Sequence, residues 1–154
     1  MGVDASSSST GATLIDNDKL IASLIWQPTN KAADPSERLF DFYQWIGDQL
    51  YLYRPSLVVV SVTSFSRSHN TTRVLARYEG ASIIAARMYS CEVIEARDSQ
   101  ARALVLSKGN VSKEEAYKEV LQMEPKFDWL PFSKGGNDQA DAFVFAKAGP
   151  QLRP

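Results

Sequence analysis

Cysteine and histidine are nearly absent from this sequence of 154 residues, which contains one of each, Cys91 and His69. A single cysteine forms no disulfide within the chain, and it excludes a cysteine zinc site. A lone histidine likewise builds no histidine metal cluster. Because Cys91 lies in an apolar, strand-like stretch, we expect a buried structural thiol.

Long apolar runs are also missing, since none reaches the ~18 residues needed to span a membrane. The first residues, Met1 to Ala5, lack the basic segment followed by an apolar one that marks a signal peptide. Met1-Gly2 meets part of the myristoylation pattern, but Val3-Asp4 then begins a strand. We therefore expect a cytoplasmic protein with no membrane partner.

The sequence has no excess of charge of either sign, with a formal net charge of -1 and a pI of about 5.8. A nucleic-acid partner would therefore have to be attracted by a local basic face. Hydrophobic residues make up 44% and charged residues 23% of the chain, as in a globular protein. The length suits a single domain spanning residues 1–154, without repeats or linkers.

The chain begins with three strand-like stretches, Gly2 to Ala5, Thr10 to Ile15 and Leu20 to Trp26, which are too close together for helical crossovers. They predict an antiparallel meander. The next predicted elements are a helix over 35–53, a β-branched strand over 57–62, a polar loop over 64–70, a helix over 74–88 and a strand over 91–96. Three further helices are predicted from Asp98 to near Gly109, from Ser112 to before Pro125 and from Asp138 onward. The tail over 149–154 is expected to be frayed.

This order of elements predicts an α/β fold of the ribonuclease-H-like arrangement. We expect a mixed sheet, in which the three-stranded meander is continued by parallel strands and helices cover both faces. In that arrangement the first strand lies at the centre of the sheet, so Asp4 at its end would face the beginning of the last helix.

Asp138 and Asp141 lie three residues apart on one face of the last predicted helix. An apolar stripe follows on that helix, formed by Ala140, Phe143, Val144 and Ala148. Two interpretations remain open. Asp138 caps the helix while Asp141 complements its dipole, or the two carboxylates join Asp4 in a hard-cation site.

Five ordered segments of the sequence resemble motifs of the RuvC family of Holliday-junction resolvases. They are Gly2-Val3-Asp4 with Thr10-Gly11, the proline-led strand from Pro55 to Ser61, the helix from Asn70 to Gly80, Val93-Ile94-Glu95 followed by Ala101-Arg102, Gly109 and Lys113, and Asp138-Gln139-Ala140-Asp141-Ala142. The resemblance covers essentially the whole chain, and the stretch from Pro55 to Lys113 follows the family pattern without a gap.

The resemblance implies a homodimer that cuts four-way or other branched DNA by metal-assisted phosphodiester hydrolysis, in a bacterial or phage-infected bacterial cell. It implies that Asp4, Asp138 and Asp141 hold two Mg²⁺ ions per site, with Mn²⁺ as an alternative metal. Arg102 and Lys113 match basic catalytic positions of the family near the scissile phosphate, although both also suit a solvated helix face. A distant RuvC-like branch acts on RNA, but the basic helix favours DNA junctions.

Ser61 departs from the family pattern, because it stands where family members have a glutamate at the end of the central strand. A serine hydroxyl is at best a weak, neutral metal ligand. Three explanations remain open. A nearby acid such as Glu79 or Glu95 compensates, although Glu79 also suits an exposed helix position; the serine is an introduced inactivating substitution; or the protein binds junctions with little or no cleavage.

The loop after that strand is the predicted place of DNA contact. Phe65 is a candidate for stacking on a base, one residue beyond the family's aromatic position, and its alternative place is the protein core. The candidate phosphate contacts are Arg67, His69, Arg73, Lys108 and Lys113. The apolar residues of the second helix, Leu75, Ile83, Ile84 and Met88, either form the surface of the dimer or cover the sheet.

Overall fold

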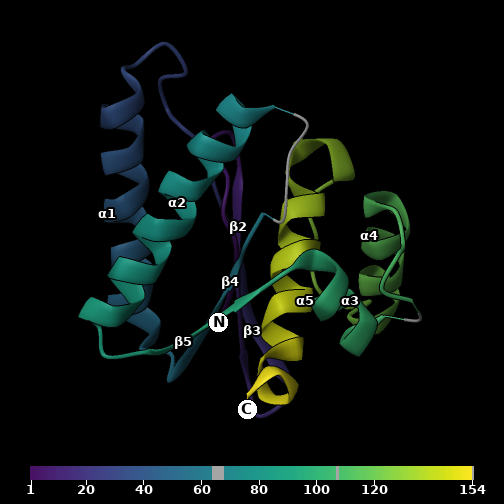
Figure 1. Ribbon diagram of the computed structural model, residues 1–154. Helices are drawn as coiled ribbons and strands as arrows, with labels where there is room; N and C mark the ends of the chain where they lie inside the picture. The colour runs from purple at the N-terminus through teal and green to yellow at the C-terminus, as the bar shows by residue number, and fades with distance from the viewer. Residues whose placement is uncertain (64–67, 107, 154) are drawn as a thin grey trace.

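In the computed structural model, which describes residues 1–63, 68–106 and 108–153, five strands form one mixed sheet (Figure 1). The strands are β1 (Gly2–Asp4), β2 (Thr10–Asp16), β3 (Lys19–Trp26), β4 (Leu57–Ser61) and β5 (Glu92–Ala96), in the order β3-β2-β1-β4-β5. β1 pairs antiparallel with β2 and parallel with β4, and β4 pairs parallel with β5. The predicted meander, its parallel continuation and the central place of β1 are confirmed.

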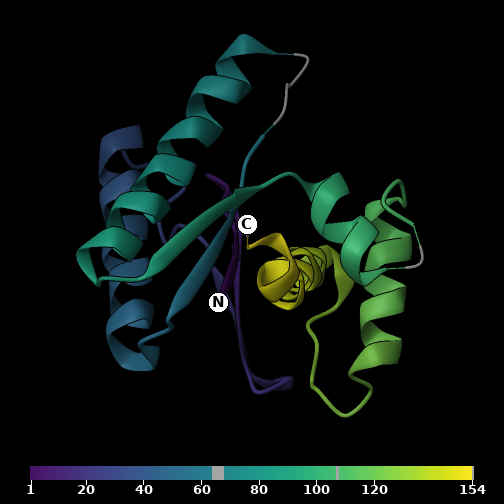
Figure 2. The same ribbon diagram turned by 60° about the horizontal axis from the view of Figure 1, so that its bottom comes forward.

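Helices cover both faces of this sheet, as the sequence predicts (Figures 1 and 2). One face carries α1 (Pro35–Tyr53) and α2 (His69–Met88). The other carries α5 (Gly136–Leu152), and α3 (Asp98–Val105) and α4 (Lys113–Met123) pack on its outer side. A short 3₁₀ helix, η1 (Phe132–Lys134), precedes α5. Within the part of the chain that the structure describes, no helix has the length and apolar character needed to cross a bilayer.

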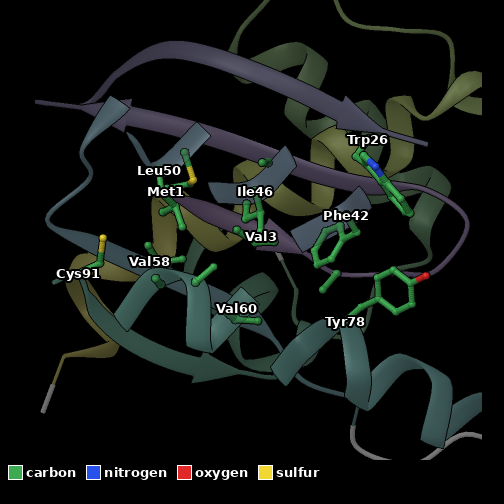
Figure 3. Packing of buried hydrophobic residues seen from close by; sticks show 14 residues of the cluster. Met1, Val3, Trp26, Phe42, Ile46, Leu50, Val58, Val60, Tyr78 and Cys91 are labelled. Carbon is green, nitrogen blue, oxygen red and sulfur yellow. The ribbon is translucent and has the colours of Figure 1, made fainter. Parts of the chain in front are cut away.

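The β-branched run of β4 supplies side chains to a hydrophobic core on each side of the sheet. Val58 and Val60 belong to the core beneath α1 and α2, whereas Val59 belongs to the one beneath α5. This alternation is the two-residue period of a strand. Figure 3 shows the first core, in which Phe42 lies against the rings of Trp26 and Tyr78. Cys91 is a free, buried thiol at the edge of this core, as expected.

Two glycines let α5 lie directly on the sheet. A Cβ atom at Gly11 in β2 would lie 2.0 Å from the backbone oxygen of Asp138, and one at Gly2 in β1 would lie 2.2 Å from that of Ala142. Both distances are far inside van der Waals contact, so only glycine permits this approach. The Thr10-Gly11 motif therefore has a physical role, because it brings the first turn of α5 against β2 beside Asp4.

Several predicted boundaries are wrong by a few residues. α2 begins at His69, because the Ser68 side chain accepts a hydrogen bond from the backbone N–H of Thr71 and caps the helix. The predicted loop over 64–70 therefore extends too far. α3 ends at Val105, before Gly109, and β1 ends at Asp4.

The predicted fraying of residues 149–154 is also wrong as far as Leu152, since α5 continues to that residue through Pro150. Gly149 is buried, and a Cβ atom there would lie 3.1 Å from the side chains of Leu57 and Val59. This contact holds the last turn against β4, although Pro150 removes one helix hydrogen bond. Pro154 lies outside the described residues.

Candidate active site

A pocket of about 480 Å³ opens at the carboxyl ends of β1, β4 and β5. Parallel strands end at the same edge of a sheet, and ligands of α/β proteins commonly bind at such edges. The lining residues come from the ends of β1, β4 and β5 and the residues that follow them, from α2, from the segment that leads into α4, and from the start of α5. They are Asp4, Ala5, Ser6, Ser61, Val62, Thr63, Leu75, Arg97, Asp98, Ser99, Arg102, Gly109, Asn110, Val111, Lys113 and Asp138.

Asp4, the last residue of β1, is the most perturbed carboxyl group of the pocket. Its backbone pairs with Gly11, the residue against which the backbone of Asp138 packs. Burial and repulsion by nearby aspartates, foremost Asp141, raise the pKa of Asp4 from 3.8 to about 7, although Lys113 opposes this shift. Within the described residues, neither a hydrogen bond nor an ion pair reaches the Asp4 carboxylate.

Asp138 lies in the first turn of α5, where its carboxylate faces the pocket. The interpretation that it caps the helix is wrong, because α5 begins two residues earlier, after Gly135 in a left-handed conformation with φ of 101°. Its side chain instead accepts a hydrogen bond of 2.7 Å from the Asn137 side chain. Burial nevertheless raises the pKa of Asp138 above its usual value.

Asp141 is buried one turn further along α5 and is held between two cations. The Arg102 guanidinium donates a hydrogen bond of 2.7 Å to Oδ1, and Lys113 Nζ lies 3.2 Å from Oδ2. Arg102 also donates to the backbone oxygen of Val111 at 3.1 Å, so one buried side chain ties α3 to α5 and to the segment before α4.

The two basic residues of the predicted site differ in exposure. Arg102 is only 8% exposed, which overturns the solvated-face interpretation for this residue. The side chain of Lys113 is 50% exposed and lines the pocket. Burial alone would lower the pKa of Lys113, but Asp4 and Asp141 outweigh it and raise that pKa, so the ammonium stays charged beside the acids.

Asp98 is a carboxylate of the pocket that the motifs do not identify. It follows β5 by two residues and begins α3. Burial, followed by repulsion from Asp141, raises the pKa of Asp98. The signal that points to this residue is positional, because β5 is parallel to β4 and an acid just beyond its end must lie near the end of β4. Arg97, exposed on the pocket wall, is a second residue missed in this way.

Ser61 is buried at the end of β4, and its hydroxyl accepts a hydrogen bond of 3.0 Å from the backbone N–H of Ala5. The two acids considered as replacements for the family glutamate do not line the pocket. Glu79 accepts hydrogen bonds from the backbone N–H and the hydroxyl of Thr63, at 2.9 and 2.7 Å. Glu95 is exposed on β5.

Most of the predicted DNA contacts lie within the described residues. Arg73 and Lys108 are exposed, and Lys113 lines the pocket. Phe65 and Arg67 lie outside the described residues.

The donors of the pocket suit a hard divalent cation in their chemistry, because Asp4, Asp98 and Asp138 supply carboxylate oxygens whose mutual repulsion a cation would relieve. In their present arrangement, no three Asp, Glu, His or Cys side chains of the described residues are close enough to hold one metal ion together. Positive charge at Asp141 comes from Arg102 and Lys113, so the chain neutralises part of the acidic cluster with its own side chains.

Comparisons with known proteins find sequence and structural similarity to RuvC proteins. No family model matches the chain. The crossover junction endodeoxyribonuclease RuvC of Caldanaerobacter subterraneus is 25% identical over 118 residues, covering 77% of this chain and 69% of the relative. RuvC of Carboxydothermus hydrogenoformans is 24% identical over 151 residues, covering 97% of this chain and 93% of the relative.

Two solved structures have the same fold. Thermus thermophilus RuvC in complex with a Holliday junction substrate matches with a TM-score of 0.77 at 21% identity, covering 94% of this chain and 87% of that protein. A second structure of Thermus thermophilus RuvC matches with a TM-score of 0.74 at 20% identity, covering 94% and 89%. The chain therefore resembles RuvC proteins in sequence and shares their α/β fold, as its motifs predict.

Proposed function

We propose that this chain, like the RuvC proteins it resembles, is a metal-dependent endonuclease that cuts four-way or other branched DNA. The observation that carries the proposal is the convergence of Asp4, Asp98, Asp138 and Lys113 on one open pocket at the carboxyl edge of the sheet. Acidic side chains repel the phosphates of DNA, so a pocket lined by three aspartates suits DNA chemistry when a cation stands between the acids and the phosphate.

Asp4, Asp138 and Asp141 are the proposed ligands of Mg²⁺, with Mn²⁺ as an alternative, at two ions per site. Such ions supply an activated water and charge stabilisation at the leaving oxygen of an in-line displacement. Lys113 extends a half-exposed ammonium group into the pocket, where it can bind a phosphate oxygen. Arg102 acts as a positioning residue, because its guanidinium is buried against Asp141 and fixes that carboxylate relative to α3.

Exposed Arg73 and Lys108 beyond the pocket, and exposed Arg97 on its wall, are further proposed phosphate contacts. A homodimer is proposed as well, because two active sites would let one assembly nick two strands. Support comes from the outer surface of α1 and α2, which carries several exposed large hydrophobic side chains: Phe40, Tyr51, Leu52, Ile84 and Met88.

Replacing Asp138 by asparagine tests the proposed nuclease. The substitution keeps the size of the side chain and removes its charge, so we expect cutting of a labelled four-way junction to fall by at least about a hundredfold while junction binding in Ca²⁺ is retained. Asp128→Asn, at an exposed position outside the pocket, is the matched control. Cutting by Asp138→Asn at the wild-type rate would show that this aspartate does not hold the metal.

A second candidate function is junction binding with weak or no cleavage, and Ser61 is the observation that favours it. The wild-type protein decides between the two when it is given a four-way junction beside a linear duplex, first with Mg²⁺ and then with Mn²⁺. Symmetric nicking of the junction alone supports the nuclease. Tight junction binding without cutting in either metal supports the binding protein.

A further inference from the structure

Asp98 lies just beyond the end of β5, the strand beside the end of β4 where family members have a glutamate. Ser61, the last residue of β4, pairs in parallel with Ala96, the last residue of β5. Asp98 follows Ala96 by two residues, and its side chain and that of Ser61 line the same pocket. A negative charge absent at the end of one strand is thus present just beyond the end of its neighbour.

Ser61 cannot supply this charge, and its hydroxyl is already engaged by the backbone N–H of Ala5. Asp141 does not make up for this charge, since its side chain is 4% exposed and is already paired with Arg102 and Lys113. The Asp98 side chain is 46% exposed, so its oxygens can reach a ligand that enters the pocket.

A further observation points to a positively charged ligand at this place. The carboxylate of Asp4 has no hydrogen-bond or ion-pair partner among the described residues, although it is largely buried and is repelled by Asp98. Buried carboxylate oxygens normally have donors or cations at hydrogen-bonding distance.

We infer that Asp98 is a divalent-cation ligand of this chain and replaces the carboxylate that Ser61 does not provide. The inference rests on the proposed function, because it assigns a ligand to the same metal site. Asp4, Asp98 and Asp138 then supply carboxylates from the lining of one pocket, and together with Asp141 they regain the carboxylate count that the RuvC resemblance implies for the site.

Asp98 has one competing role, which is structural. Its carboxylate lies 3.9 Å from Arg102, one helical turn away, and it lies in the first turn of α3, where a negative charge complements the helix dipole. Loss of Asp98 could therefore act through Arg102. A carboxylate introduced at position 61 separates the two roles, because it restores charge to the pocket without restoring the contact with Arg102.

The experiment measures Mn²⁺ binding to the full chain in the absence of DNA, from the electron paramagnetic resonance signal of free Mn²⁺. We expect Asp98→Asn to weaken Mn²⁺ affinity about tenfold or more, and the double variant Ser61→Glu/Asp98→Asn to recover most of that loss. Glu95→Gln is the matched control, since it removes an exposed carboxylate from β5 that does not line the pocket. If Ser61→Glu does not fold in this buried position, Ser61→Asp takes its place.

Junction cutting by Asp98→Asn should also require a correspondingly higher Mn²⁺ concentration.

Suppose that the wild-type protein binds Mn²⁺ and cuts junctions, but that Asp98→Asn binds Mn²⁺ as tightly as Glu95→Gln does. This inference would then be wrong, and the proposed function would stand. A loss that neither acid at position 61 restores would assign Asp98 to the support of Arg102 and would overturn it too. Wild-type protein that neither binds Mn²⁺ nor cuts would instead refute the proposed nuclease itself.

Discussion

At the scale of single residues, the site combines buried acids with two basic side chains, and the balance between them is uneven. Asp141 has Arg102 and Lys113 close by, whereas Asp4 is repelled by its acidic neighbours and forms no ion pair among the described residues. Carboxylates of this kind cost folding free energy when no cation is bound, which is typical of functional sites. The acidic cluster therefore lowers the stability of the metal-free protein, and a bound cation of the proposed site would offset this cost.

Asp4 should make the metal-free protein less stable as the pH rises. Its pKa is about 7 in the folded chain and close to 3.8 when unfolded, so the folded state binds more protons between these values. Stability then falls with increasing pH across this window and levels off above it. In chelator, we expect Asp4→Asn to be more stable than wild type at about pH 8 by roughly 1–4 kcal/mol, and to lose most of this advantage at about pH 4.

Urea unfolding of both proteins at several pH values measures this difference. Asp128→Asn, the exposed control, should follow the wild-type curve at every pH. An Asp4→Asn curve parallel to that of wild type would mean that Asp4 is charged at the same pH in both states. Saturating Mn²⁺ should narrow the gap between Asp4→Asn and wild type, because bound cation stabilises only the folded protein that retains its ligands.

Residue-level prediction from the sequence is strongest where a motif specifies an acid and weakest where a partner must come from another element. Asp4 and Asp138, both singled out from the sequence, line one pocket, and Asp141 lies one turn beyond Asp138. The Arg102–Asp141 hydrogen bond joins residues separated by 39 positions, and no local pattern specifies it. Asp98 is missed for the same reason. Its place in the pocket follows only once β5 is known to lie beside β4.

At the scale of elements, the site depends on how closely α5 approaches the sheet. Gly11 pairs with Asp4 in the β1–β2 ladder and also contacts the backbone of Asp138. The spacing between the two aspartates is therefore determined by one residue without a side chain. Sequence patterns predict α5 and β2 separately, but the contact between them follows only from the packed layers.

Gly11→Ala should displace the first turn of α5. The added Cβ would lie 2.0 Å from the Asp138 oxygen, so helix and strand must separate. We expect a loss of about 1–3 kcal/mol in the free energy of unfolding and weaker Mn²⁺ binding, because Asp138 moves away from Asp4. Unfolding in urea and Mn²⁺ titration measure the two effects.

Gly80→Ala is the control for this change, since a Cβ there meets nothing within 4 Å. Gly80 lies within α2, so alanine should leave Mn²⁺ binding unchanged and stabilise the helix by up to about 1 kcal/mol. Equal behaviour of the two variants would show that the close approach of α5 to β2 does not position the aspartates.

At the scale of the whole molecule, apolar surface is concentrated on the layer formed by α1 and α2. Ile84 and Met88 on α2 are 59% and 68% exposed, whereas Leu75 and Ile83 of the same helix are half-buried. The sequence left open whether the apolar residues of this helix cover the sheet or form a dimer. The structure divides them, because one side of α2 packs on β4 and β5 and the other faces outward.

Replacing Ile84 and Met88 together by glutamate should convert the proposed homodimer into a monomer. Both side chains are more than half exposed, so the free energy of unfolding measured per chain should change little, whereas charge on an apolar interface opposes association. Sedimentation equilibrium of the variant beside wild type measures the change. Leu104→Glu, at an exposed position on α3, is the control. A wild-type monomer, or a variant that stays dimeric, would contradict the proposed interface.

The sequence by itself determined the order and type of the elements, because hydrophobic periodicity, turn residues and caps act over a few neighbouring positions. Its motifs also singled out Asp4 and Asp138, two of the acids that line the pocket. Only the tertiary structure decided that the Ser61 hydroxyl accepts a hydrogen bond from Ala5, that Glu79 accepts hydrogen bonds from Thr63, and that Asp98 lines the same pocket as Asp4. These relations join residues that are distant along the chain. They depend on strand order, on helix-to-sheet spacing and on which buried polar groups still need a partner once the layers have packed.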